Sequence, residues 1–169
     1  MKRNALLSIL FLLLISVVYA SSTGQTDNPE PPAEDGIHWY TLEEALELQE
    51  KNPKKLFIDF YTDWCGWCKV MDSKTFTQDE VIDHLNASYY AVKFDAEQKE
   101  AVTFRGQTYE FHASGRRGIN LFAYAILDKQ ASYPAFVVLD KELNRQGILR
   151  GYLKPDVLLS KLQKLETTK

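Results

Sequence analysis

Short apolar stretches alternate with helical periodicities along most of this chain. Stretches rich in aromatic and β-branched residues recur at 56–62, 89–95, 135–140 and 146–152. The first three are apolar on both faces, a pattern typical of strands buried on both sides of a sheet in α/β proteins. Only a short polar turn separates the last two stretches, so we expect them to pair as an antiparallel hairpin.

Helical patterns fill the intervals between the expected strands. Thr41 and Glu44 form a capping-box pattern at the start of the first helix, and Thr77 and Glu80 form a second one further along the chain. Between these two positions, another helix is expected to begin at the two cysteines and to run toward Ser73. The first half of the chain therefore predicts three helices around two strands.

Two more helices are expected in the second half of the chain. One follows Gly118, and the other begins at Pro155, because proline suits the first helical position. The apolar face of the first comprises Ile119, Phe122, Ala123, Ile126 and Leu127. Residues 96–118, which contain RGQ at 105–107, are expected to add a small hairpin and a loop.

The order of these elements predicts the α/β fold class. Helices that alternate with strands in the first part imply parallel strands joined by crossover helices, and the final hairpin adds antiparallel strands. We therefore expect one domain over residues 36–169, built as a mixed central β-sheet flanked by helices.

The beginning of the chain has a different pattern. A short positive segment precedes an apolar run from Ala5 to Val18, and Ala20 marks a possible cleavage point. Residues 1–20 therefore have the pattern of a secretory signal peptide, with an uncleaved N-terminal membrane anchor as the alternative. Residues 21–35 are rich in Pro, Ser, Thr and acids, which predicts a flexible linker. We expect an exported protein, periplasmic if the source is a Gram-negative bacterium.

Composition and charge narrow the classes of function. The chain has 169 residues, of which 45% are hydrophobic and 25% charged, as in a globular protein with one domain of ordinary size. Its formal net charge of −3 provides no basic field, so no nucleic-acid partner is expected. We expect the protein to be a monomer.

The only two cysteines, Cys65 and Cys68, lie in the stretch YTDWCGWCK. A structural disulfide between them would close too small a loop to restrain the unfolded chain much. The pair follows an expected buried strand and opens a helix, whose first turn has unpaired N–H groups and the positive end of the helix dipole. These groups favour a thiolate, so Cys65 is placed to attack a disulfide and Cys68 to resolve the mixed disulfide.

Metal binding is the alternative use of two neighbouring thiols. A structural zinc site needs four ligands, and His38, His84 and His112 each lie in a different segment without a second ligand nearby. A Cu(I) carrier needs only the thiolates of Cys65 and Cys68, so a metallochaperone remains the alternative function. No resident cofactor is expected.

The sequence around the cysteines resembles the active site of the thioredoxin superfamily. WCGWCK at 64–69 is similar to the WCGPCK motif of that family, with Trp67 in the place of the proline. Asp59, six residues before Cys65, corresponds to the buried acid of the family, and Lys93 to the lysine beside that acid. Three separate features, namely the cysteine motif, the acid and the lysine, therefore agree with the family.

Further correspondences lie later in the chain. Tyr133-Pro134 corresponds to the cis-proline element of the family, and Gly151 to a glycine at the end of its final strand. The resemblance is closest to exported thioredoxin-like proteins and to the periplasmic C-terminal domain of transmembrane disulfide reductases. The insertion at 96–118, ahead of the cis-proline element, departs from plain thioredoxin.

The resemblance implies a thioredoxin-like fold and a redox function. The implied catalytic residues are Cys65, Cys68, Asp59 and Lys93. The implied substrate-binding residues are Trp64, Gly66, Trp67, Tyr133 and Pro134. The implied activity is that of an exported thiol–disulfide oxidoreductase acting on protein disulfides, with a membrane disulfide reductase as electron donor. Reductase or isomerase activity is favoured over strong oxidation, because Asp59 accompanies Lys93.

Several positions leave a second interpretation open. Asp59 is also compatible with a half-exposed strand edge, and Lys93 with a side chain that points to solvent. Pro134 is also compatible with a trans proline at the start of a strand. A non-catalytic interaction domain with a vestigial motif is a third hypothesis of function, and the retention of both cysteines with the acid and the lysine argues against it.

Overall fold

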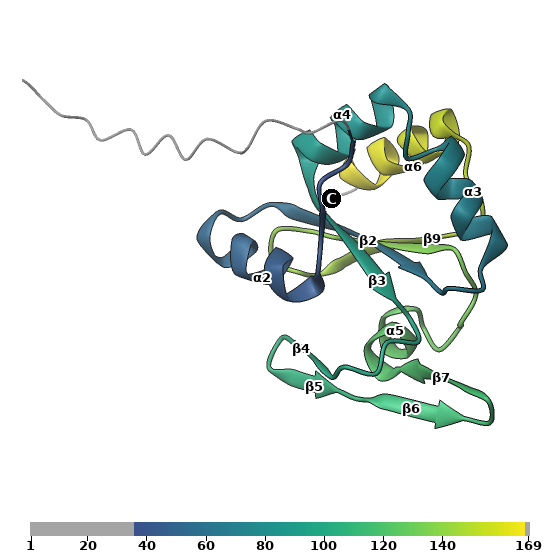
Figure 1. Cartoon of the computed structure of the whole chain (residues 1–169). Helices are drawn as coiled ribbons and strands as arrows, with labels where there is room; N and C mark the ends of the chain where they lie inside the picture. Colours follow the sequence, from purple (N-terminus) through teal and green to yellow (C-terminus); the bar gives the residue numbers. More distant parts are fainter. Residues whose placement is uncertain (1–35, 168–169) are drawn as a thin grey trace, which may run out of the picture. The chain divides into compact units, whose positions relative to one another are not determined.

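The described part of the chain is a β-sheet covered by helices on both faces. A computed structural model describes residues 36–167 (Figure 1). The predicted signal peptide at 1–20 and linker at 21–35 lie outside the described residues. Within residues 36–167, no helix is both long enough and apolar enough to cross a bilayer.

The central sheet has five strands in the order β1-β3-β2-β8-β9, and it is mixed as predicted. The strands are β1 (Trp39–Tyr40), β2 (Lys55–Tyr61), β3 (Tyr89–Asp95), β8 (Ala135–Leu139) and β9 (Arg145–Arg150). β1, β3 and β2 are parallel to one another, whereas β8 pairs antiparallel with β2 and with β9. The predicted hairpin of the last two strands is thus confirmed. The two-residue edge strand β1 is not among the predicted strands.

Two groups of helices cover the sheet. The helices are α2 (Leu42–Lys51), α3 (Gly66–Lys74), α4 (Asp79–Ser88), α5 (Leu121–Ile126) and α6 (Pro155–Thr167). α2 and α5 lie on one face of the sheet, and α3, α4 and α6 lie on the other (Figure 1). Side chains of β2 alternate between the two cores, so Ile58 packs with the first group and Phe57 with the second.

Aromatic side chains fill the core beside α3. Phe57 of β2 stacks on Phe136 of β8 with ring centroids 5.5 Å apart. Phe76, which follows α3, meets both rings edge-on. Burial of each fully buried ring contributes about 1.5–3 kcal/mol relative to an exposed ring. This cluster fixes the C-terminal end of α3 on the sheet.

The two predicted capping boxes have different outcomes. The one at Thr41 and Glu44 is confirmed, because each residue's backbone N–H donates to the side chain of the other. The one at Thr77 and Glu80 is wrong, because the N-cap of α4 is Gln78 and no side chain caps this helix. The Thr77 hydroxyl instead donates to a backbone carbonyl of α3.

The helix predicted after Gly118 begins later than expected. Gly118 and Ile119 belong to β7 (Arg117–Asn120), and Asn120 is the N-cap of α5. A Cβ at residue 118 would lie 2.1 Å from the ring of Phe111 on the paired strand, so glycine allows the two strands to approach. Strand pairing therefore takes precedence over the helical periodicity at these positions.

The insertion at 96–118 forms two hairpins rather than one hairpin and a loop. The first pairs β4 (Val102–Phe104) with β5 (Gln107–Tyr109), and the second pairs β6 (Phe111–Ser114) with β7. Arg105 and Gly106 between β4 and β5 both have positive φ, 52° and 77°, as a two-residue hairpin turn of this kind requires. The hairpins lie next to α5 (Figure 1).

Thr75 ties the end of α3 to the segment before α6, and this bond yields a prediction. The buried Thr75 hydroxyl donates to the Leu153 carbonyl at 2.7 Å. Thr75→Val keeps the shape of the side chain but leaves the carbonyl without this donor, so the free energy of unfolding should fall by about 1–3 kcal/mol.

Thr77→Val is the matched control, because the Thr77 hydroxyl makes an exposed hydrogen bond. Its loss should change the free energy of unfolding by no more than about 0.5 kcal/mol. Chemical denaturation of both variants measures the two effects. Equal effects of the two substitutions would contradict the assigned role of Thr75.

Candidate redox-active site

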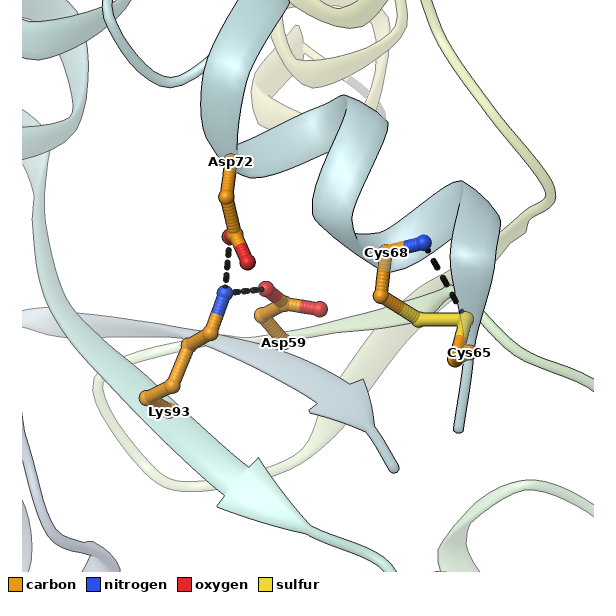
Figure 2. The surroundings of a disulfide bond; sticks show 5 residues. All are labelled: Asp59, Cys65, Cys68, Asp72 and Lys93. Carbon is orange, nitrogen blue, oxygen red and sulfur yellow. Dashed lines mark hydrogen bonds and ion pairs between the residues drawn. A yellow bond between two sulfur atoms is a disulfide. The ribbon is translucent and has the colours of Figure 1, made fainter. Parts of the chain in front are cut away.

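Cys65 and Cys68 lie at the junction between β2 and α3, where the sequence predicts them. Cys65 is the N-cap of α3, and the two cysteines form a disulfide. The Cys68 backbone N–H donates to Cys65 Sγ at 3.1 Å (Figure 2). The exposed fractions of Cys65 and Cys68 are only 4% and 3%. The first turn of the helix thus points a donor at the Cys65 sulfur, where it stabilises negative charge.

Asp59 is a buried carboxyl group in the middle of β2. The residue is 1% exposed, and its oxygen Oδ1 has no hydrogen-bond partner among the described residues. In Figure 2 this carboxyl group lies between Lys93 and the cysteine pair. Burial raises the pKa of Asp59 to about 6, because the nearby Lys93 ammonium offsets only part of the desolvation. A half-exposed position at a strand edge is therefore excluded.

Lys93 lies opposite Asp59 on the neighbouring strand β3. The two residues are register partners, and Lys93 Nζ is 2.7 Å from Asp59 Oδ2. Burial alone would lower the pKa of Lys93, but the charges and hydrogen bonds of Asp59 and Asp72 together outweigh it, and the pKa is raised. Lys93 is therefore charged and bound to Asp59, rather than simply pointing to solvent.

Three aromatic rings surround the ammonium group of Lys93. Its Nζ lies 4.9 Å from the ring centroid of Trp39 and 5.3 Å from those of Tyr61 and Phe76. A ring that meets a cation in this way contributes about 0.5–1 kcal/mol at an exposed site. The three rings come from β1, from the end of β2 and from the segment after α3, so three elements fix the position of the cation.

Asp72 is a residue of this site that the sequence analysis does not select. It lies on α3, and its carboxylate forms a second ion pair with Lys93, which therefore bridges Asp59 and Asp72 (Figure 2). The charge of Asp72 adds to the rise in the pKa of Asp59. The sequence carried one signal, because Asp72 follows Cys68 by four residues and so shares its helix face.

The Tyr133–Pro134 peptide bond, directly before β8, is cis. The trans alternative for Pro134 is therefore wrong. The Gly151 N–H donates to the Pro134 carbonyl at 2.8 Å, and Gly151 has a φ of 77°, which favours glycine. The glycine expected at the end of the final strand thus contacts the proline loop.

Trp64 and Trp67 form an exposed aromatic rim beside the buried disulfide. Their exposed fractions are 50% and 61%. The Trp64 ring lies 6.1 Å from that of Tyr133, and the Trp67 ring 5.6 Å from that of Tyr152. Gly66 lies between the two tryptophans in sequence, and a Cβ there would meet nothing within 4 Å. Exposed aromatic side chains of this kind are typical of surfaces that bind another protein.

The histidines do not gather around the cysteines. In residues 36–167, no three or more side chains of histidine, cysteine, aspartate or glutamate are grouped so as to hold a metal ion. His84 instead lies 3.3 Å from a carboxylate oxygen of Glu166. The cysteines therefore have no histidine partner for a four-ligand zinc site within the described segment.

Solved structures share the fold of the described residues. A DsbH oxidoreductase is 20% identical with a TM-score of 0.56, over 88% of this chain and 96% of that chain. A thioredoxin from Thermus thermophilus is 18% identical with a TM-score of 0.57, over 78% and 88% of the two chains. A putative disulphide-isomerase from Bacteroides thetaiotaomicron is 23% identical with a TM-score of 0.56, over 80% and 97%. These similarities show a thioredoxin-like fold.

In sequence, the chain is similar to parts of longer proteins. It is 26% identical over 110 residues to an uncharacterised protein of Caenorhabditis elegans, a match that covers 63% of this chain and 15% of that protein. It is 28% identical over 71 residues to spermatogenesis-associated protein 20 of Rattus norvegicus, which covers 41% of this chain and 9% of that protein. The chain thus spans only a small fraction of these two relatives.

One family matches most of the chain. Residues 30–150 match Thioredox_DsbH, a family described as protein of unknown function, DUF255. The matched segment contains both cysteines, Asp59, Lys93 and the cis-proline element. Together with the fold, this match shows that the chain belongs to the Thioredox_DsbH family, within the thioredoxin superfamily.

Proposed function

We propose that this protein is an exported thiol–disulfide oxidoreductase that acts on protein disulfides through Cys65 and Cys68. The observation that supports this most is the buried carboxyl group of Asp59, which keeps one oxygen unpaired beside the cysteine pair. A purely structural disulfide does not need such a group, since a buried carboxyl oxygen without a hydrogen-bond partner costs stability. A carboxyl with a pKa of about 6 is suited to proton exchange near neutral pH.

In the reducing direction, the cycle starts from the dithiol. The Cys65 thiolate attacks one sulfur of a substrate disulfide, and the substrate S–S bond breaks. The second substrate sulfur leaves as a thiolate and takes a proton from solvent. Cys65 is now joined to the substrate in a mixed disulfide. Asp59, as a carboxylate, accepts the proton of the Cys68 thiol, directly or through a water molecule.

The second half of the cycle releases the substrate. The Cys68 thiolate attacks the Cys65 sulfur, the mixed disulfide breaks, and the first substrate sulfur leaves as a thiolate that is protonated. Two electrons have passed from the dithiol to the substrate. The protein ends with the Cys65–Cys68 disulfide of the structure, and Asp59 returns its proton to solvent. The same steps in reverse oxidise a substrate dithiol.

The charges around the cysteines support reduction or isomerisation over strong oxidation. An Asp59 carboxylate near the thiols disfavours a second negative charge on a sulfur, and so counteracts the helix N-terminus. Strong oxidants of this class owe their potential to a stabilised reduced form. A thiolate that is less stabilised makes the dithiol a better electron donor.

The substrate contacts of the proposal are the residues around the disulfide. Trp64 and Trp67 provide exposed ring surface, and Gly66 leaves room for close approach. The loop of Tyr133 and Pro134 offers its backbone to an extended substrate segment, in the manner of strand addition.

Location and electron supply are also proposals. Export rests on the signal-peptide pattern of residues 1–20, which implies the periplasm in a Gram-negative bacterium. A reductase in an oxidising compartment needs a source of electrons, and a membrane disulfide reductase is the proposed donor. We propose that the protein acts as a monomer.

The first test is covalent trapping. In Cys68→Ser the resolving thiol is absent, so Cys65 should remain joined to substrate proteins in mixed disulfides that a reductant releases. Non-reducing electrophoresis with mass spectrometry identifies them. Cys65→Ser is the control and should trap far less. Tight Cu(I) binding without any trapped partner would favour the metallochaperone instead.

Asp59→Asn should stabilise the protein at neutral pH. Because the folded-state pKa of Asp59 is raised from 3.8 to about 6, the wild-type protein loses stability as the pH rises through this window. At pH 7 the loss is about 2–3 kcal/mol, and the neutral amide avoids it. Chemical denaturation should show a more stable variant at pH 7 and little difference at pH 3.5. A variant that is less stable than wild type at pH 7 would contradict the burial cost assigned to Asp59.

Asp72→Asn should shift the pH dependence of the reaction. Removing the charge of Asp72 lowers the pKa of Asp59, and it leaves Asp59 as the only carboxylate that forms an ion pair with Lys93 within the described residues. Stopped-flow fluorescence measures the rate at which Cys68 resolves a preformed mixed disulfide. This rate should therefore reach half its maximum at a lower pH than in wild type. Asp83→Asn, on exposed α4 surface, is the control and should leave the profile unchanged. Identical profiles for all three proteins would refute the link.

A further inference from the structure

The Trp64 side chain contacts residues from three other segments of the chain. It precedes Cys65 in the chain, and its indole Nε1–H donates to a Glu97 carboxylate oxygen at 3.0 Å. The Tyr133 ring contacts its edge, and the Arg117 guanidinium carbon lies 4.1 Å from the ring centroid. These contacts hold the indole in place while half of its surface remains exposed beside the disulfide.

Arg117 reaches this position from the insertion. It is the first residue of β7, paired with Ser114 of β6, so the second hairpin of the insertion delivers a cation to the rim of the redox site. Arginine has five N–H donors, whose planar arrangement matches a carboxylate. Its exposed guanidinium has no hydrogen bond or ion pair within residues 36–167. The ring contact fixes the group without using its donors.

The acidic groups near Trp64 are partly engaged within the chain. Glu97 accepts the indole N–H, and Asp95 accepts the backbone N–H of Glu97 at 2.9 Å. Burial raises the pKa of Asp95, and the charges of Asp63, Glu97 and Glu100 raise it further. A substrate carboxylate is repelled from this acidic side and finds its complementary charge at Arg117.

We propose, on the basis of the proposed function, that Arg117 is a specificity-determining residue for disulfides in acidic polypeptide segments. Its guanidinium, held on Trp64, binds an Asp or Glu side chain next to the substrate cysteine that Cys65 attacks. The guanidinium donates two N–H groups to the carboxylate, a geometry that lysine cannot reproduce. Because the ring already orders the arginine, little side-chain freedom is lost on binding.

The test uses three peptides, each with one disulfide, that differ only in the residue beside the attacked cysteine, which is Glu, Gln or Lys. The reduced full-length protein serves as the stoichiometric reductant, so no electron donor is needed. Stopped-flow fluorescence gives the second-order rate constant for each peptide. The wild-type protein should reduce the Glu peptide about fivefold faster than the Gln peptide, and salt should diminish this ratio.

Variants of neighbouring arginines separate this contact from general charge. Arg117→Gln should bring the ratio of Glu to Gln rate constants to about 1, and Arg117→Lys should recover only part of it. Arg116→Gln is the matched control, because it removes an equal charge from the same hairpin without a contact to Trp64. It should keep most of the wild-type ratio. Circular dichroism confirms that all variants are folded.

Several results would overturn the proposal. One is an equal ratio of Glu to Gln rate constants in wild type and Arg117→Gln, and another is a loss of this ratio in Arg116→Gln as large as in Arg117→Gln. A third is a wild-type preference for the Lys peptide, which would assign the selectivity to the acidic groups. Reduction of all three peptides at one rate would refute the selectivity alone. Reduction of none by the wild-type dithiol would also refute the proposed function.

Discussion

The burial of a single carboxyl group in the central strand constrains the rest of this site. Asp59 is enclosed by the sheet and by α3, and the sheet register places Lys93 opposite it. The ammonium is held in turn by three aromatic rings and by Asp72. One oxygen of Asp59 nevertheless stays unpaired on the side of the cysteines. Burial of apolar side chains in the two cores around Asp59 offsets this cost, in a domain whose stability is expected to be about 5–15 kcal/mol.

Local rules make much of this structure readable from the sequence. The Thr41–Glu44 capping box, the apolar strands and the start of α6 at Pro155 each depend on residues close together in the chain, and all three were predicted correctly. The placement of Cys65 at a strand-to-helix junction follows from the same local patterns. The burial of Asp59 was predictable because its neighbours on both sides are apolar. Its partner Lys93 and the cis-proline were reached only through the resemblance to a known family.

Other features depend on contacts between distant segments. Asp72 joins the site only because β3 brings Lys93 beneath α3, and Arg117 because a hairpin folds back onto Trp64. A helical pattern follows Gly118 in the sequence, but its close approach to Phe111 places this glycine in a strand. Arg117 and Gly118 belong to the insertion at 96–118, which departs from plain thioredoxin and places a cation against Trp64, next to Cys65 in the chain.

The reduction potential of the Cys65–Cys68 pair tests the central claim most directly. It reports whether the buried Asp59 carboxylate and its surroundings leave the dithiol a reductant, without reference to any particular substrate. The protein is equilibrated in redox buffers of defined potential, and the fraction of free thiols is measured by alkylation and mass spectrometry. A value near about −270 mV is expected of a reductase, whereas a value near about −120 mV belongs to a strong oxidant and would contradict the proposed direction of electron flow.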